Sequence, residues 1–331
     1  MLLRLKIALL LTCCWSACSS AMENYALHPA AQALMDELVA EQNFDRENLL
    51  VVFSGAQRQE SILTAISRPA EKSKPWYQYR EIFLNDKRLE QGVQFFHEHR
   101  ATLERAERET GVPAEIIVAI IGVETSYGRI KGSYRVIDAL STLAFDYPPR
   151  SEFFTGELKS YLILTRQQGF DPLALKGSYA GAMGYGQFMP SSFLNYAVDF
   201  DGDGVEDIWN NPTDAIGSVA NYFRGHGWRK GETVVVAAAV QGDVSEQWFV
   251  QGRKNLTPEH TVAQFAEAGV VAKQPLDPAA MATAMKFQLQ NGYEYWIGLH
   301  NFYVITRYNH SAMYAMSVYE LSRRIAARID R

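Results

Sequence analysis

The sequence predicts a mainly helical α+β protein with one small β-containing insertion. Helical periodicity of apolar residues dominates both ends of the chain, whereas residues 233–304 break into short β-branched or aromatic runs separated by turn residues. A chain of 331 residues that is 47% hydrophobic and 21% charged can form two or three domains with a substantial core. No internal repeat or low-complexity tract is visible, so a solenoid is not expected.

The N-terminal half is predicted to be helical. Residues 28–59 follow a helical pattern, residues 67–75 form a loop, and residues 89–109 form one long charged amphipathic helix. Pro113 is suited to the first turn of the next helix, and Gly128 is suited to its end.

The sequence pattern of the C-terminal half changes twice, from helical to strand-like and back. Residues 233–240, 284–289 and 293–297 are predicted strands of a small sheet. Residues 312–329 return to helical periodicity. The sheet is therefore expected to be an insertion between helical segments.

The first twenty residues have the layout of a secretory signal. Arg4 and Lys6 precede an apolar run at 7–11 that is too short to span a bilayer, and small residues follow. All three cysteines lie here, so a disulfide framework in the mature domain is excluded. They are Cys13, Cys14 and Cys18.

The segment Trp15-Ser16-Ala17-Cys18 resembles a bacterial lipobox, in which the cysteine becomes the lipidated first residue. Trp15 departs from the usual aliphatic residue, while Ser19 after the cysteine fits sorting to the outer membrane. We therefore expect a periplasmic outer-membrane lipoprotein anchored at Cys18. The alternative is cleavage after Ala21, which gives a soluble periplasmic protein.

The charge pattern argues against nucleic acid as a partner. The formal net charge is −5 for the whole chain, and no basic block is interleaved with aromatic residues. No nucleic-acid partner is therefore expected.

Glu124 is the most prominent candidate for acid–base chemistry. On a helical wheel Ile117, Ile120 and Ile121 lie within about 60° of it, so the carboxyl belongs to an apolar face. Burial raises the pKa of a carboxyl and keeps it protonated, which suits a general acid. The alternative is that Glu124 leans into water at the helix end or caps a backbone group.

Two blocks together carry a family resemblance. Glu124-Thr125-Ser126-Tyr127-Gly128 resembles the catalytic signature of lytic transglycosylases, and residues 177–192 resemble the second, glycine-rich block. The glycines of that block would let its backbone approach a sugar closely. It is not a phosphate loop, because Gly184-x-Gly186 lacks a third glycine and no Gly-Lys-Ser/Thr occurs.

With residues 215–223 and 307–316 the resemblance extends over most of the chain. The sequence is identified as a member of the membrane-bound lytic murein transglycosylase B family, in the lysozyme-like superfamily. The resemblance implies that Glu124 is catalytic and that seven further residues contact sugar. These are Ser178, Gln187, Tyr222, Tyr308, Asn309, Tyr314 and Arg150. Each tyrosine taken alone could equally be a packing residue.

The resemblance also implies a domain plan with a lysozyme-like catalytic core. The expected units are a signal peptide at 1–17, a helical domain at 18–107 joined by 311–331, the core at 108–230, a small β domain at 231–306, and a segment at 307–331 that completes the cleft and the helical domain.

An EF-hand-like loop lies inside the core. Asp199, Asp201, Asp203 and Val205 match positions 1, 3, 5 and 7, with Val205 offering its carbonyl. Position 12 is Asn210 rather than the bidentate Glu, and the resemblance implies Asp214 as the closing ligand instead. We expect a structural Ca²⁺ and no organic cofactor; the alternative is an acidic turn without metal.

The implied reaction needs one carboxyl. Glu124 would protonate the bond between N-acetylmuramic acid and N-acetylglucosamine, then accept a proton from the muramoyl C6 hydroxyl, leaving a 1,6-anhydromuramoyl end. Two alternatives remain: a hydrolytic muramidase, in which Asp138, Asp146 or Glu152 could be a second acid, and a non-catalytic calcium-stabilised wall-binding lipoprotein. The expected partners are glycan strands of peptidoglycan and, through the anchor, a membrane; the protein is expected to be a monomer.

Overall fold

The computed structural model describes residues 24–67, 74–250 and 256–329. The predicted signal segment with Cys18 and most of the predicted loop at 67–75 lie outside these residues. None of the helices within the described ranges is both long and apolar enough to cross a membrane.

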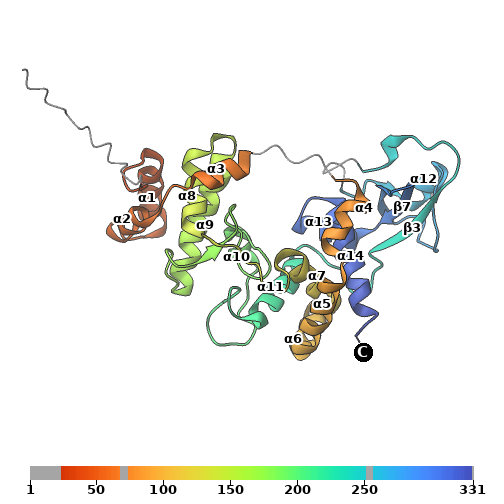
Figure 1. Cartoon of the computed structure of the whole chain (residues 1–331), viewed down its shortest axis with the longest axis horizontal. Helices are drawn as coiled ribbons and strands as arrows, with labels where there is room; N and C mark the ends of the chain where they lie inside the picture. The colour runs from red at the N-terminus through yellow and green to blue at the C-terminus, as the bar shows by residue number, and fades with distance from the viewer. Residues whose placement is uncertain (1–23, 68–73, 251–255, 330–331) are drawn as a thin grey trace, which may run out of the picture.

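Helices make up most of the described chain (Figure 1), as predicted. In chain order they are α1 (Pro29–Gln42), α2 (Arg46–Gly55), α3 (Glu60–Ser67), α4 (Trp76–Phe83), α5 (Asp86–Glu98), α6 (Arg100–Thr110), α7 (Ala114–Thr125), α8 (Val136–Asp146), α9 (Ser151–Gln168), α10 (Pro190–Tyr196), α11 (Pro212–Gly225), α12 (Val262–Glu267), α13 (His300–Tyr308) and α14 (Ala312–Ala326).

The predicted helical pattern at 28–59 is confirmed, and it is divided between two helices. Asn43 ends α1 in the left-handed conformation, with φ of 53°. Asp45 then starts α2 by accepting a hydrogen bond from the backbone N–H of Asn48 at 2.9 Å. A left-handed residue followed by an N-cap is a local stop and restart that apolar periodicity does not register.

The predicted single helix at 89–109 is wrong. It divides at His99, whose φ of −117° and ψ of 21° end α5 and precede α6. The His99 ring packs on Phe95 at a centroid distance of 4.5 Å. Both helices keep one apolar face toward the core, so the break leaves the periodicity almost unchanged.

The N-terminal helices pack in two separate places. Helices α1 and α3 lie against α9 and α8, respectively, whereas α4 and α5 pack on α14 and α6 packs on α11 (Figure 1). The C-terminal helix α14 also packs on α7. The expected unit at 18–107 is thus divided between two packing environments, one of which contains the C-terminal segment.

Helix α7 runs through the middle of the core. Each residue from Ala114 to Val123 is buried, so the helix is enclosed on all sides rather than amphipathic. It starts directly after Pro113, as predicted, but it ends at Thr125, earlier than the predicted Gly128. The reason is that Ser126 already adopts the left-handed conformation.

The predicted β insertion forms an antiparallel five-stranded sheet with the order β4-β6-β7-β3-β5. Its own small core includes Phe249, Phe265 and Ile297, and α12 packs on it. The strands are β3 (Val235–Val240), β4 (His260–Thr261), β5 (Val270–Ala272), β6 (Met281–Gln288) and β7 (Tyr293–Gly298). A separate two-stranded ribbon pairs β1 (Tyr134–Arg135) with β2 (Lys176–Gly177) inside the helical part.

Candidate active site

Glu124 lies in the last turn of α7 and keeps intermediate exposure. Tyr314, from the first turn of α14, donates a hydrogen bond to its Oε1 at 2.5 Å. Burial raises the pKa of Glu124 from 4.5 to about 7, although the Tyr314 hydrogen bond acts in the opposite direction. The carboxyl is therefore balanced between its two protonation states near neutral pH.

The environment of Glu124 explains this pKa. Ile117, Ile120 and Ile121 are all fully buried. Because α7 is enclosed on every side, the helix end, rather than a polar face, leaves Glu124 partly open. The alternative in which Glu124 leans freely into water does not fit this arrangement, because its carboxyl accepts a hydrogen bond from Tyr314.

Thr125 joins the two sequence blocks and was not recognised as a site residue from the sequence. Its hydroxyl donates to the carbonyl of Tyr185 at 2.9 Å and accepts from the N–H of Gly128 at 2.9 Å. The ring of Tyr185 packs so closely on Gly128 that an added Cβ would lie 2.0 Å from it. Its position directly after Glu124 in the signature was the available signal.

Gly186 of the second block makes room for a tyrosine of α13. Tyr308 donates its hydroxyl to the carbonyl of Gly186 at 2.5 Å, and a Cβ on Gly186 would lie 2.7 Å from that hydroxyl oxygen. The sequence interpretation assigned close approach to a sugar to the glycines of the second block, and the end of a helix to Gly128. In the structure, Gly128 and Gly186 permit close approach of the protein's own aromatic side chains.

Ser178 and Gln187 shape the second block from within. Ser178 Oγ accepts hydrogen bonds from the N–H groups of Ala180 and Ala182 at 3.3 and 3.0 Å. Gln187 has φ of 53°, and its Nε2 donates to the carbonyl of Gly184 at 3.0 Å. Both side chains hold the loop conformation, and both keep intermediate exposure.

Two of the predicted sugar-contacting tyrosines, Tyr222 and Tyr308, belong to one aromatic cluster. The rings of Tyr222 and Tyr308 have centroids 4.7 Å apart, and Tyr222 is only 8% exposed. Tyr222 donates its hydroxyl to the carbonyl of Arg307 at 2.7 Å. Burial is the largest cause of the raised pKa of Tyr314. Tyr79 of α4, which the sequence interpretation did not recognise as a site residue, is near enough to contribute to this pKa.

The remaining predicted sugar contacts lie at the surface. Asn309 is exposed where α13 ends. Arg150 is exposed, and its guanidinium lies over the rings of Phe153 and Phe154 at 4.3 and 4.9 Å, all three within one short segment. The described contacts do not join Arg150 to Glu124.

The acidic loop, residues 199–205, gathers three carboxylates. Oxygen atoms of Asp199, Asp201 and Asp203 lie within 4.8 Å of one another, close enough to share one cation. Asp199 also accepts backbone N–H bonds from Gly204 and Gly202 at 2.8 and 2.7 Å, and these bonds, the Gly204 bond foremost, lower its pKa. The donor set of hard oxygen atoms fits Ca²⁺.

Asp214 occupies a different position from the three clustered acids. It is fully buried, and its two oxygens accept the N–H groups of Phe200 at 2.8 Å and Asp207 at 2.9 Å. Burial raises the pKa of Asp214. Asp214 therefore braces the loop from α11 in this structure, whereas Asn211 donates to Asp201 at 2.8 Å.

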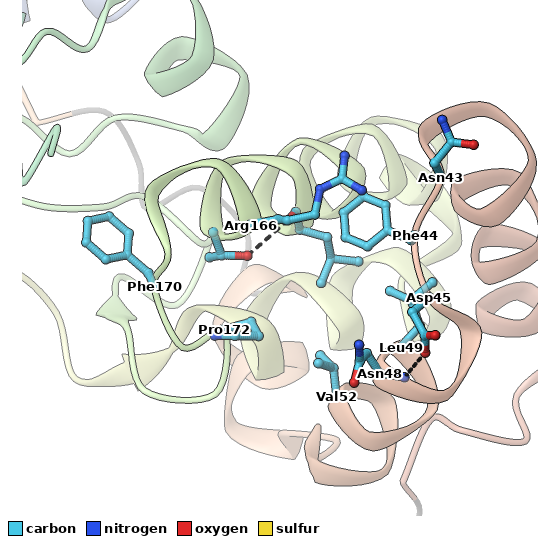
Figure 2. Close-up of a pocket in the computed structure, with 11 residues that line it drawn as sticks. Asn43, Phe44, Asp45, Asn48, Leu49, Val52, Arg166, Phe170 and Pro172 are labelled. Atoms are coloured by element: carbon cyan, nitrogen blue, oxygen red, sulfur yellow. Dashed lines mark hydrogen bonds between the residues drawn. The ribbon is translucent and has the colours of Figure 1, made fainter. Parts of the chain in front are cut away.

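A concave region lies away from the predicted site residues. Figure 2 shows a cavity of about 410 Å³ between the turn joining α1 to α2 and the C-terminal part of α9, with Phe44 and Phe170 among its walls. Arg166 stacks over the Phe44 ring at 3.7 Å. None of the predicted site residues lines this cavity, so its size does not make it the centre of the chemistry.

Comparison with known proteins identifies the family of this chain. The model of the transglycosylase SLT domain family matches residues 26–323. Membrane-bound lytic murein transglycosylase B of Escherichia coli (strain K12) is 45% identical over 312 residues, which is 92% of this chain and 84% of that protein.

Two solved structures extend the likeness to the fold. Catenated lytic transglycosylase SltB1 from Pseudomonas aeruginosa has a TM-score of 0.89 at 53% identity, covering 92% of this chain and 99% of that chain. Escherichia coli lytic transglycosylase Slt35 in complex with calcium has a TM-score of 0.84 at 46% identity, covering 92% and 96%. These matches confirm the predicted lysozyme-like fold class and the predicted family, and the chain belongs to the transglycosylase SLT family of lytic transglycosylase enzymes.

Proposed function

We propose that this enzyme cleaves the β-1,4 bond between N-acetylmuramic acid and N-acetylglucosamine in peptidoglycan, acting as a monomer, and leaves a 1,6-anhydromuramoyl end. The observation that carries the proposal is the Glu124 carboxyl with a pKa of about 7, held by Tyr314. A group that is half protonated near neutrality can serve first as an acid and then as a base.

The reaction proceeds in two proton transfers through Glu124. The protonated carboxyl donates its proton to the glycosidic oxygen as the bond to C1 breaks, with the acetamido group of the substrate supporting the positive charge. The carboxylate then accepts the proton of the muramoyl C6 hydroxyl as that oxygen bonds to C1. The Tyr314 hydrogen bond favours the carboxylate form and so supports the second half.

The partners of the other candidate acids support a single-carboxyl mechanism. Asp138 pairs with Arg135 at 2.8 Å, and Asp146 accepts the hydroxyl of Tyr25 at 2.5 Å. Glu152 is exposed in the first turn of α9. Burial and the Tyr314 hydrogen bond are the influences on the pKa of Glu124, and none of these three acids contributes to it. A second carboxylate that flanked the scissile bond would lie close enough to act on that pKa.

The experiment that tests this proposal is mass analysis of the sugars released from purified sacculi. Anhydromuramoyl ends, which are one water lighter than hydrolysed ends, support the proposal. Hydrolysed ends would indicate a muramidase, and no release at all would indicate a non-catalytic wall-binding protein.

We also propose that the acidic loop binds a structural Ca²⁺ through Asp199, Asp201, Asp203 and the carbonyl of Val205. The three clustered carboxylates support it, as does the calcium complex of the relative Slt35. Asp214 closes the site either as a ligand, as the family resemblance implies, or as the brace described above. When bound, the ion would supply positive charge that stabilises the loop.

The proposed location is the periplasm, at the outer membrane through a lipid on Cys18. The lipobox-like sequence and the membrane-bound name of the Escherichia coli relative support this proposal. Cys18→Ser should move the protein out of the membrane fraction, and intact mass should show a lipidated N-terminus at Cys18. An unlipidated N-terminus at Met22 would instead assign a soluble periplasmic enzyme.

A further inference from the structure

The turn that follows Glu124 has an unusual backbone. Ser126, Tyr127 and Gly128 adopt positive φ in succession, at 50°, 62° and 80°. Only glycine accepts this region without steric cost, so two of the three residues need compensating contacts. The catalytic carboxyl therefore sits directly before a segment that other parts of the molecule must hold in place.

Tyr127 supplies the first of these contacts. Its side chain is 6% exposed and lies between α5 and α7, at Gly92 and Gly122. A Cβ added at either glycine would lie 2.4 or 2.5 Å from the Tyr127 hydroxyl oxygen, so the two helices leave a slot that fits this ring. The hydroxyl donates to the backbone carbonyl of Arg88 in α5 at 2.9 Å.

Arg88 in turn contacts the C-terminal end of α7. Its Nη1 donates to the carbonyl of Gly122 and, at 3.4 Å, to the carbonyl of Val123. These carbonyls immediately precede Glu124 and carry the partial negative charge of a helix C-terminus, which a cation stabilises. The Arg88 guanidinium also lies over the ring of Phe83 at 5.4 Å. No ion pair within the described chain includes Arg88, so its positive charge is available to stabilise the C-terminal end of α7.

We infer that Arg88 and Tyr127 form a reciprocal clasp between α5 and α7 that positions the Glu124 carboxyl for proton transfer. The inference rests on the proposed role of Glu124 as acid and base. Neither residue is a catalytic residue, because each acts through the backbone that carries Glu124. Proton transfer depends steeply on donor placement, so a loosened helix end lowers turnover more than binding.

The test measures kcat and KM on soluble glycan strands with the full chain. Arg88→Met should lower kcat by about 10- to 100-fold while KM changes by less than about twofold. Arg88→Lys should recover part of kcat, since an ammonium keeps the charge but not the planar double donor. The matched control is Arg100→Met, an exposed arginine of α6 that pairs only with Glu104 at the surface.

Tyr127→Phe provides a variant that keeps the buried ring and removes only the hydroxyl bond to Arg88. It should lower kcat by less than Arg88→Met. The Arg88→Met and Tyr127→Phe double variant should lose less than the product of the two single losses, because the residues act as one unit. Should Arg88→Met not fold, Arg88→Lys and Tyr127→Phe carry the same comparison.

Three results would overturn the clasp: unchanged kcat in a folded Arg88→Met protein, an equal loss in Arg100→Met, or a raised KM at constant kcat. Failure of the proposed function looks different. Wild-type protein would then yield no anhydro ends, or Glu124→Gln would remain active, whatever the Arg88 variants do.

Discussion

The carboxyl group of Glu124 and the carboxylates of the acidic loop lie in contrasting environments. Burial raises the pKa of Glu124 to about 7, whereas backbone N–H groups lower the pKa of Asp199, whose neighbours Asp201 and Asp203 are exposed. Within the described residues, the Glu124 carboxyl has one hydrogen-bonding partner, Tyr314, and it has apolar neighbours along α7. Asp199 has several N–H donors and two further carboxylates nearby.

The difference shows that the surroundings of a carboxyl determine its protonation state and therefore the function for which it is suited. A desolvated carboxyl keeps its proton and is able to give it away. A solvated, N–H-bonded carboxylate stays ionised and is suited to a cation. Neither behaviour belongs to the residue type itself, so altering each environment is the direct way to test the comparison.

The largest expected effect is on turnover at the buried site. Glu124→Gln keeps the side-chain shape and removes the acid, so release of anhydro sugars from sacculi should fall by at least about 100-fold. Circular dichroism and thermal melting should show an intact fold. Near wild-type release by a clean preparation of this variant would refute the assignment of Glu124.

The second effect concerns stability and pH. The folded chain holds the Glu124 proton up to about pH 7, whereas the unfolded chain releases it near 4.5. Stability from this group is thus full below pH 4.5 and is lost as the pH rises through 7, by up to about 3 kcal/mol. Relative to wild type, Glu124→Gln should therefore gain unfolding free energy between pH 4.5 and 8. Denaturant titrations at both ends measure this, and a difference independent of pH would contradict the raised pKa.

The third effect belongs to the exposed site. Calcium at 100 times its Kd should add about 2.7 kcal/mol, or about 5 °C in melting temperature, because only the folded loop binds it. Asp201→Asn combined with Asp203→Asn should abolish the shift, while Glu90→Gln with Glu267→Gln, both exposed elsewhere, should preserve it. Identical wild-type melting curves in chelator and in millimolar Ca²⁺ would favour an acidic turn without metal.

The smallest expected effect concerns the protonation equilibrium of Glu124. Tyr314→Phe removes the hydrogen bond that lowers the pKa of Glu124, so this pKa should rise above about 7. Activity should then persist to higher pH, while the optimum rate drops by about tenfold, or about 1.4 kcal/mol. Tyr319→Phe, on the same helix, is the control. An unshifted pH–rate profile would mean that Tyr314 does not tune the acid.

The sequence alone determined the family, the mainly helical class and three of the five strands of the insertion. These properties reside in local patterns: the two blocks around Glu124 and Gly184, and the short β-branched runs after residue 233. The apolar neighbours of Glu124 were also evident, because residues three and four apart share a helix face. The breaks at Asn43 and His99 were not, since a single residue can end a helix without disturbing the apolar pattern on either side.

Tertiary structure alone decided what surrounds each site residue. Tyr314 reaches Glu124 across 190 positions of sequence, and Tyr308 reaches Gly186 across 122. Gly186, which the sequence offered to a sugar, makes room for Tyr308, and Gly128 makes room for Tyr185. Asp214 lies beneath the acidic loop rather than among its clustered acids. Side-chain partners of this kind depend on how distant helices pack, and helical or strand periodicity specifies only which face of each element is buried.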